Sequence, residues 1–366
     1  MADFHQNGNI TTLHNLRTRG VEELNYELSA FAQTRKISLI LPSLFSELEG
    51  EALPHIVDEL GKVPYLHRIV IGLDRATEAQ FRQARAFFSS LPQDHIVIWN
   101  DSPRMLEMQA RLENLGLAPQ EPGKGKNVWS CIGYLIGCAD SAVMAIHDCD
   151  ILTYENEMLA RLVYPVANPT FPYQVAKGYY PRVGEGKLNG RVTRLLVSPL
   201  LIALKRVIGD RDYLDYLRSF RYPLSGEFAM RTAILPDLRI PSDWGLEIGV
   251  LSEAWRNLAP KSVCQVEISD AYDHKHQDLS AEDASMQIPV GWLLDNVGPK
   301  KTSSILFGIG AAGGAALFAV AQGPGTVNLA MALIGIGCSP VLMANYITNA
   351  RVFEPRVFGM KTGVVL

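Results

Sequence analysis

Hydrophobic positions between residues 37 and 164 follow two alternating patterns. Short runs rich in β-branched residues are predicted to form buried strands; these runs are Ile37–Leu41, His67–Ile71, His95–Trp99 and Ala142–Ile146. The longer stretches Gly50–Leu60 and Glu78–Ser89 have the amphipathic spacing of helices and lie between strands. Strands that alternate with helices indicate βαβ units. We therefore expect an α/β fold with a parallel sheet covered by helices.

The pattern changes near the end of the chain. The 49 residues from Thr302 to Ala350 contain no Asp, Glu, Lys, Arg or His, whereas the preceding part is charged throughout. The turn Gln322–Thr326 leaves apolar stretches of about 19 and about 23 residues, and each could cross a hydrocarbon core of about 30 Å. We expect a transmembrane helical hairpin, with a buried helix pair in a soluble protein as the alternative.

Basic residues flank this predicted hairpin on both sides. Lys300 and Lys301 precede it, and Arg351 and Arg356 follow it. By the positive-inside rule both ends face the cytoplasm. The charged part of the chain is therefore expected to be cytoplasmic and attached to the membrane by the tail.

Composition narrows the class of protein. With 366 residues, of which 48% are hydrophobic and 20% charged, the chain can form one large or two ordinary domains. A net charge of -4 excludes the basic footprint of a nucleic-acid-binding protein. The five cysteines include no Cys-x-x-Cys pair, so neither a disulfide framework nor a structural zinc site is predicted. No signal peptide is recognisable at the start of the sequence.

Two carboxylates follow the last predicted strand, in the motif His147-Asp148-Cys149-Asp150. Side chains at positions i and i+2 share one face of a strand, so where the strand ends both can reach one hard cation. Asp150 would bind a divalent cation directly, and Asp148 directly or through a nucleotide. Taken alone, Asp-x-Asp is also compatible with an ordinary turn.

Other polar segments fall at the same edge of the predicted sheet. Pro42-Ser43-Leu44 and Asp74-Arg75 follow strands, and ligands of such sheets bind at the carboxyl ends of strands. The loop Pro122–Asn127 is rich in glycine and lysine and is expected to open a helix at about Val128. Its N–H groups and lysines suit a diphosphate, although a solvated turn would have the same composition.

A series of short motifs resembles that of glucosyl-3-phosphoglycerate synthases and their close relatives. The motifs are Pro42–Leu44, Gly123–Lys126, His147–Asp150, Gly190–Thr193, Gly226–Phe228, Trp244–Gly249 and Tyr272–His276. The resemblance covers about residues 30–282 and implies a GT-A domain, which is a Rossmann-like nucleotide-diphospho-sugar transferase fold, over residues 1–282. It also implies retaining glycosyl transfer, Mg²⁺ or Mn²⁺, a UDP- or GDP-hexose donor, and 3-phosphoglycerate or a similar phosphorylated or carboxylated acceptor. A homodimer is a possible assembly.

The resemblance assigns roles to individual positions. Donor binding is implied for Pro42, Ser43, Leu44, Glu47, Lys124 and Asp148. Acceptor binding is implied for Arg191, Thr193 and His276. Metal binding is implied for Asp148, Asp150 and His274. Catalysis is implied for Lys124, Asp150 and Glu247, the last as an acid near the reacting sugar.

The tail resembles part of a major facilitator transporter. Gly291–Lys301 is similar to the loop between the second and third helices of these transporters, and Ala332–Gly337 to their fourth helix. The match covers only about residues 286–366, and a few helices cannot form an alternating-access transporter. We therefore expect residues 283–366 to be a transporter-like transmembrane fragment that does not transport.

These interpretations lead to one predicted reaction. The acceptor hydroxyl attacks the sugar from the face that the nucleoside diphosphate leaves, while a cation and Lys124 neutralise the leaving diphosphate. Two alternatives stay open at this point: a nucleotidyltransferase on the same fold, and a catalytically inactive membrane fusion fragment.

Overall fold

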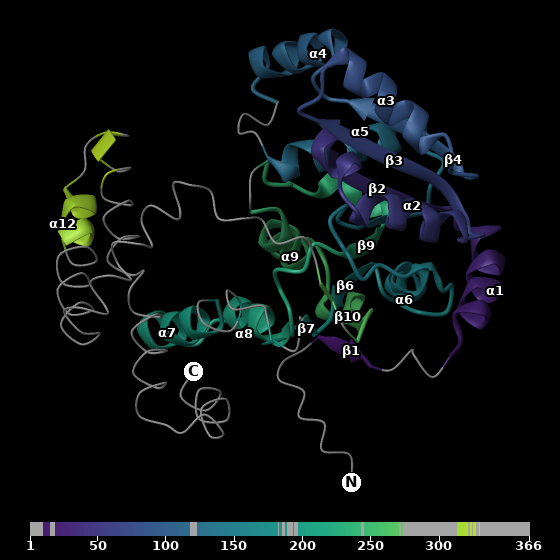
Figure 1. The fold of residues 1–366 in the computed structure, drawn as a ribbon. Coiled ribbons are helices and arrows are strands. Elements are labelled where there is room, and N and C mark those ends of the chain that lie inside the picture. Colours follow the sequence, from purple (N-terminus) through teal and green to yellow (C-terminus); the bar gives the residue numbers. More distant parts are fainter. Residues whose placement is uncertain are drawn as a thin grey trace. The chain divides into compact units, whose positions relative to one another are not determined.

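The structure is a computed structural model that divides into two compact units, Met1–Lys275 and His276–Leu366. It describes residues 10–14, 19–117, 123–181, 183–184, 187–188, 193, 197–242, 245–270, 272–273, 313–320, 323, 325–326 and 329. The predicted domain boundary after residue 282 lies outside these residues and stays a prediction. Figure 1 shows the elements of both units.

The first unit contains a mixed sheet, whose order among the described strands is β1-β10-β6-β9-β5-β2-β3-β4. The strands are β1 (Thr11–Leu13), β2 (Ile37–Leu44), β3 (Leu66–Asp74), β4 (Asp94–Trp99), β5 (Val143–Ile146), β6 (Val175–Tyr179), β9 (Phe228–Arg231) and β10 (Val263–Glu267). Strands β2 to β5 are parallel to their neighbours in this group, as predicted for residues 37–164. Strand β9 is antiparallel to both β5 and β6, so the sheet as a whole is not parallel.

Helices cover both faces of this sheet (Figure 1). They are α1 (Val21–Ala32), α2 (Ala52–Gly61), α3 (Glu78–Phe88), α4 (Pro103–Asn114), α5 (Lys124–Cys138), α6 (Asn156–Ala167), α7 (Ser198–Ile208), α8 (Asp212–Ser219) and α9 (Leu246–Asn257). Shorter elements are the 3₁₀ helices Phe45–Glu49, Thr232–Asp237 and Pro260–Ser262, and the two-residue strands β7 (Val183–Gly184) and β8 (Lys187–Leu188). The helices predicted over residues 50–60 and 78–89 correspond to α2 and α3.

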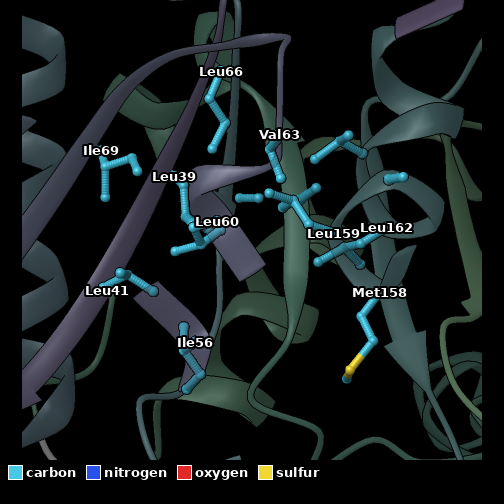
Figure 2. Close-up of a cluster of buried hydrophobic side chains, with 14 of the residues drawn as sticks. Leu39, Leu41, Ile56, Leu60, Val63, Leu66, Ile69, Met158, Leu159 and Leu162 are labelled. Carbon is cyan, nitrogen blue, oxygen red and sulfur yellow. The ribbon is translucent and has the colours of Figure 1, made fainter. Parts of the chain in front are cut away.

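The sequences of the central strands are continuously apolar because both faces of the sheet are buried. In β2, Leu39 and Leu41 belong to one buried cluster, whereas Ile40 belongs to the other. Successive side chains of a strand point to opposite faces, so each strand supplies both clusters. Figure 2 shows the first cluster, where side chains from β2, α2 and α6 converge, among them Leu60 and Leu159.

Helix α5 begins earlier than the sequence pattern predicted. The expected start was near Val128, after a loop that contains the lysines, but Lys124 is already the first helical residue. The pattern failed because glycine and lysine at the start give no apolar periodicity. The consequence is that Lys124 lies in the first turn of a helix.

The predicted transmembrane hairpin falls mostly outside the described residues. In the second unit the structure describes a short helix, α12 (Gly313–Ala319). Within the described ranges, no helix is both long enough and apolar enough to span a membrane. The transporter-like fragment therefore stays a prediction from the sequence alone.

A close contact fixes α5 against the carboxyl end of β3. The Asn127 side chain donates a hydrogen bond from Nδ2 to the Gly72 carbonyl, at 2.9 Å. A Cβ atom at Gly72 would lie 1.8 Å from Asn127 Oδ1 and 2.7 Å from Cys131 Sγ. Because both neighbours are buried, a larger residue at position 72 has no space.

We expect Gly72→Ala to lower the free energy of unfolding by about 1–3 kcal/mol, since overpacking forces the helix from the strand. The matched control is Gly133→Ala on the exposed side of α5, where an added Cβ meets nothing within 4 Å. That change should instead stabilise the helix by about 0.5–1 kcal/mol. Urea unfolding followed by circular dichroism measures both, and a Gly72→Ala protein as stable as the parent would contradict the tight contact.

Candidate functional site

Strand topology brings distant residues to one edge of the sheet. Asp148 lies two residues beyond β5, and Glu227 lies immediately before β9. Because β9 runs antiparallel to β5 and Ile146 pairs with Phe228, Asp148 lies against Gly226, the residue before Glu227. The parallel neighbour β2 ends with Leu44 at the same edge.

Acidic side chains gather at this edge. We call Glu47, Asp148, Asp150, Glu227 and Glu247 the acidic centre. Glu47 belongs to the 3₁₀ helix after β2, and Glu247 to the first turn of α9. The group thus draws on widely separated parts of the chain.

Among the described residues, Lys124 forms ion pairs with two members of this acidic centre. Its Nζ lies 2.5 Å from Asp148 Oδ1 and 3.1 Å from Glu247 Oε1. Burial acts to lower the pKa of Lys124, but the neighbouring charges of Asp148 and Glu247 outweigh it and raise the pKa above its usual range. A lysine in the first turn of a helix opposes the helix dipole, and the two carboxylates compensate for that. Lys124 therefore stays charged and joins α5, β5 and α9.

Gly226 permits this pair to lie against the backbone. A Cβ atom at this position would be 2.3 Å from Asp148 Oδ2 and 2.8 Å from Lys124 Nζ. Gly125 is constrained in the same way, because its Cβ would be 1.9 Å from the Pro241 carbonyl oxygen. These contacts explain why glycines occur in two of the motifs.

The acidic neighbours of Asp150 raise its pKa. Burial, followed by the charges of Asp148, Glu227 and Glu47, raises the pKa of Asp150 to about 7, and Lys124 opposes this only in part. Burial and the charge of Asp148 also raise the pKa of Glu227. The acidic centre thus brings together more carboxyl groups than Lys124 pairs with.

A divalent cation would compensate for the clustering of these carboxyl groups. Carboxylate oxygens are the ligands that Mg²⁺ and Mn²⁺ prefer, and a cation beside Asp148 and Asp150 would remove the repulsion between them. Within the described ranges, no three His, Cys, Asp or Glu side chains form a complete metal site. The third predicted ligand, His274, lies outside those ranges. Asp148 and Asp150 are therefore candidate ligands, and the metal site stays a prediction.

The residues predicted to bind the donor meet at the same edge. Pro42, Ser43 and Leu44 are the last residues of β2. Ser43 is buried and donates a hydrogen bond from Oγ to the Leu44 carbonyl, at 3.0 Å. Glu47 lies close enough to influence the pKa of Asp150. The predicted donor-binding residues therefore lie at the same edge of the sheet as Asp148, and their role stays a prediction.

The residues predicted to bind the acceptor are described only in part. Arg191 and His276 lie outside the described residues. Thr193 is buried, and its hydroxyl has no hydrogen-bond partner among the described residues. A buried hydroxyl without a partner costs free energy, so it is a candidate to bind a ligand.

Two functional candidates escaped the sequence pattern. Glu227 is part of the motif Gly226–Phe228, but the sequence analysis assigned it no role. In the structure it is fully buried beside Asp148. Lys177 is buried in β6 and donates a hydrogen bond from Nζ to the Ser225 carbonyl. Burial lowers the pKa of Lys177 to about 8, while Glu247 and Glu227 oppose the shift. A charged residue within the apolar run of β6 was the available signal.

His147, the first residue of the Asp-x-Asp motif, belongs to the core. Its ring packs edge-on against Tyr154, with ring centroids 5.4 Å apart, and neither ring nitrogen has a hydrogen-bond partner. Burial lowers the pKa of His147 to about 3, so the ring is neutral. Its role is to pack beneath Asp148.

Two relatives of this chain have the same name. The chain is 48% identical over 279 residues to glucosyl-3-phosphoglycerate synthase of Persephonella marina, covering 76% of this chain and 69% of that protein. It is 38% identical over 280 residues to the enzyme of the same name from Methanococcoides burtonii, covering 76% and 68% of the two chains. No family model matches the chain.

Solved structures show the same fold. Glucosyl-3-phosphoglycerate synthase of Mycobacterium tuberculosis in complex with phosphoglyceric acid superposes with a TM-score of 0.54 at 22% identity, covering 78% of this chain and 87% of that one. The same enzyme in complex with Mn²⁺, UDP-glucose and phosphoglyceric acid gives a TM-score of 0.53 at 22% identity, with 78% and 86% covered.

Proposed function

The chain belongs to the glucosyl-3-phosphoglycerate synthase family, and we propose that it transfers a hexose from a nucleoside-diphosphate sugar to 3-phosphoglycerate with the help of Mg²⁺ or Mn²⁺. One observation carries this function: the 48% identity to the Persephonella marina enzyme extends over 279 residues. The acidic centre and Lys124 supply the matching chemistry. An intact acidic centre also argues against an inactive fragment.

We propose that the donor is UDP-glucose and the acceptor 3-phosphoglycerate. The Mycobacterium tuberculosis enzyme has been crystallised with Mn²⁺, UDP-glucose and phosphoglyceric acid together, and with Mg²⁺ and UDP. A GDP-hexose would present the same diphosphate to Lys124. Release of UDP or GDP from the two donors, in the presence of 3-phosphoglycerate, therefore identifies the base as well as the reaction.

Residues of the acidic centre have separate tasks in this reaction. Asp148 and Asp150, with His274 as third candidate, would hold the cation, which when bound neutralises charge on the departing diphosphate. The Lys124 ammonium binds the same diphosphate at the start of α5, where helix N–H groups also favour an anion. Because Lys124 contacts Glu247 directly, a diphosphate that draws the ammonium away leaves this carboxylate beside the sugar.

Thr193 and Arg191 are proposed to bind the acceptor. The buried Thr193 hydroxyl has no partner of its own, and a phosphate or carboxylate oxygen would satisfy it. Arg191 stands two residues earlier and offers a guanidinium, which binds such anions at two points. The acceptor hydroxyl then attacks the sugar from the side that the diphosphate leaves.

The first test removes a charge from the metal site. Asp150→Asn changes the shape of the side chain very little, and we expect turnover to fall by at least about 100-fold because charge on the leaving group is no longer neutralised. The matched control is Asp140→Asn, since Asp140 lies before the amino end of β5 and pairs with Arg68 and His67. The control should remain active. Near-normal turnover by Asp150→Asn, or by the parent after chelation of divalent metals, would contradict the metal assignment.

The second test concerns the acceptor. Thr193→Val keeps the shape of the side chain and removes a hydroxyl that has no hydrogen-bond partner in the part of the chain that the structure describes, so stability should not fall. If the hydroxyl binds the anionic acceptor, the KM for 3-phosphoglycerate should rise about tenfold or more, with the KM for UDP-glucose unchanged. Initial-rate kinetics with each substrate varied in turn measure this.

Thr34→Val serves as control, because Thr34 precedes the amino end of β2 at the opposite edge of the sheet. It should leave both KM values unchanged. Equal effects of Thr193→Val on the two substrates, or no effect, would remove Thr193 from the acceptor site.

A further inference from the structure

A row of polar side chains crosses one face of the sheet. Thr12 in β1, Gln265 in β10 and Lys177 in β6 are neighbours in the strand register, so their side chains share a face. Gln265 and Lys177 are each only 1% exposed. The preceding residues on that face, Val175 and Val263, belong to an apolar cluster. Buried polar groups cost free energy unless they have partners, so the row is expected to bind polar groups of the chain.

The row binds the backbone of the segment that joins α8 to β9. Gln265 donates a hydrogen bond from Nε2 to the Ser219 carbonyl at 2.8 Å, and its Oε1 accepts one from the Arg221 backbone N–H at 2.8 Å. Lys177 donates from Nζ to the Ser225 carbonyl. Gln265 therefore holds the start of the segment, whereas Lys177 holds its end.

The end of this segment lies against the acidic centre. Ser225 directly precedes Gly226, where a Cβ atom would be 2.8 Å from Lys124 Nζ and 2.3 Å from Asp148 Oδ2. The backbone there leaves no space, so a movement of Gly226 toward the pair would displace Lys124 or Asp148. The carbonyl that Lys177 binds thus belongs to the residue next to this tight contact.

The ammonium group of Lys177 is poorly suited to packing alone. It carries three N–H donors, and among the described residues it has a single hydrogen-bond partner. The Phe228 ring centroid lies 5.4 Å from its Nζ. An apolar side chain of similar length would fill the same space without the cost of burying a charge. A lysine at this position therefore needs a reason other than packing.

We propose that Lys177 is a positioning residue that holds residues Ser225–Glu227 where Lys124 can bind the diphosphate of the donor. The proposal rests on the function proposed above. Because Lys177 is buried, it acts through Ser225 and not by contact with a substrate. Its hydrogen bond fixes the Ser225 carbonyl, which fixes Gly226 and with it the space in which Lys124 and Asp148 meet. Without that bond the segment can shift toward the pair and move the Lys124 ammonium.

Two substitutions separate this role from a general contribution to folding. Lys177→Met keeps the length of the side chain and removes the ammonium. Gln265→Met is the matched control, because it removes two hydrogen bonds from the same segment at the end away from Gly226. Thermal unfolding measures the effect of each on stability. If Lys177→Met does not fold, the shorter Lys177→Leu takes its place with the same expectations.

The decisive measurement compares UDP with uridine, which has the same base and ribose but no diphosphate. The Kd of each purified full-length protein is measured for UDP with Mg²⁺ by calorimetry, and for uridine by saturation-transfer NMR. We expect Lys177→Met to raise the Kd for UDP at least about tenfold, since a hydrogen bond to a charged group is typically worth that much. The Kd of Lys177→Met for uridine, and both Kd values of Gln265→Met, should stay within about twofold of the parent. GDP and guanosine replace these ligands if the parent prefers GDP.

Other outcomes overturn the proposal. An unchanged Kd for UDP in Lys177→Met would show that its hydrogen bond does not position Lys124. An equal loss of affinity for UDP and uridine, or an equal loss for UDP in the two variants, would show a general disturbance of the fold. A parent protein that binds UDP but transfers no hexose would instead refute the proposed function and leave the positioning role standing. A parent that binds neither UDP nor GDP would refute both.

Discussion

The site depends on the burial of several carboxylates around one lysine. Lys124 contacts Asp148 and Glu247 directly. Burial and the charge of Asp148 raise the pKa values of both Asp150 and Glu227, and Glu227 adds to the increase at Asp150. Such a cluster costs free energy in the absence of a cation, because like charges repel and each has lost part of its hydration. A nucleoside diphosphate with its metal brings an anion for Lys124 and a cation for the aspartates. The two together therefore complement the charges of the site better than the diphosphate or the metal alone.

The mixed sheet makes this cluster possible. In a wholly parallel sheet, all strands start at one edge and end at the other. The residue before one strand and the residue after its neighbour therefore lie at opposite edges. Antiparallel β9 reverses this rule, and so places Gly226 and Glu227 beside Asp148. The glycine then allows the Lys124–Asp148 pair to approach the backbone, while Glu227 accepts hydrogen bonds from tyrosines that follow β6 and β10.

The sequence predicted the parts of this structure that depend on local patterns. Buried strands such as β2 and β3 read clearly because both of their faces are apolar. The start of α5 was misplaced, since Gly123–Lys126 has no apolar periodicity. Strand β9 was not recognised because its sequence, Phe-Ala-Met-Arg, contains no β-branched residue. The contacts of Glu227 could not be predicted from the local sequence, because its tyrosine partners are 45 and 47 residues away. The motifs were recognised as a set, whereas the contacts that join them depend on topology.

The central claim is that the diphosphate and the cation bind together at the acidic centre. The most direct test is the affinity for UDP, measured by isothermal titration calorimetry with and without Mg²⁺. If the two share the site, Mg²⁺ should strengthen UDP binding by at least about tenfold, and UDP should strengthen Mg²⁺ binding by the same factor. Equal affinity for UDP with and without Mg²⁺ would contradict the account, because the acidic centre would then not be where the two ligands meet.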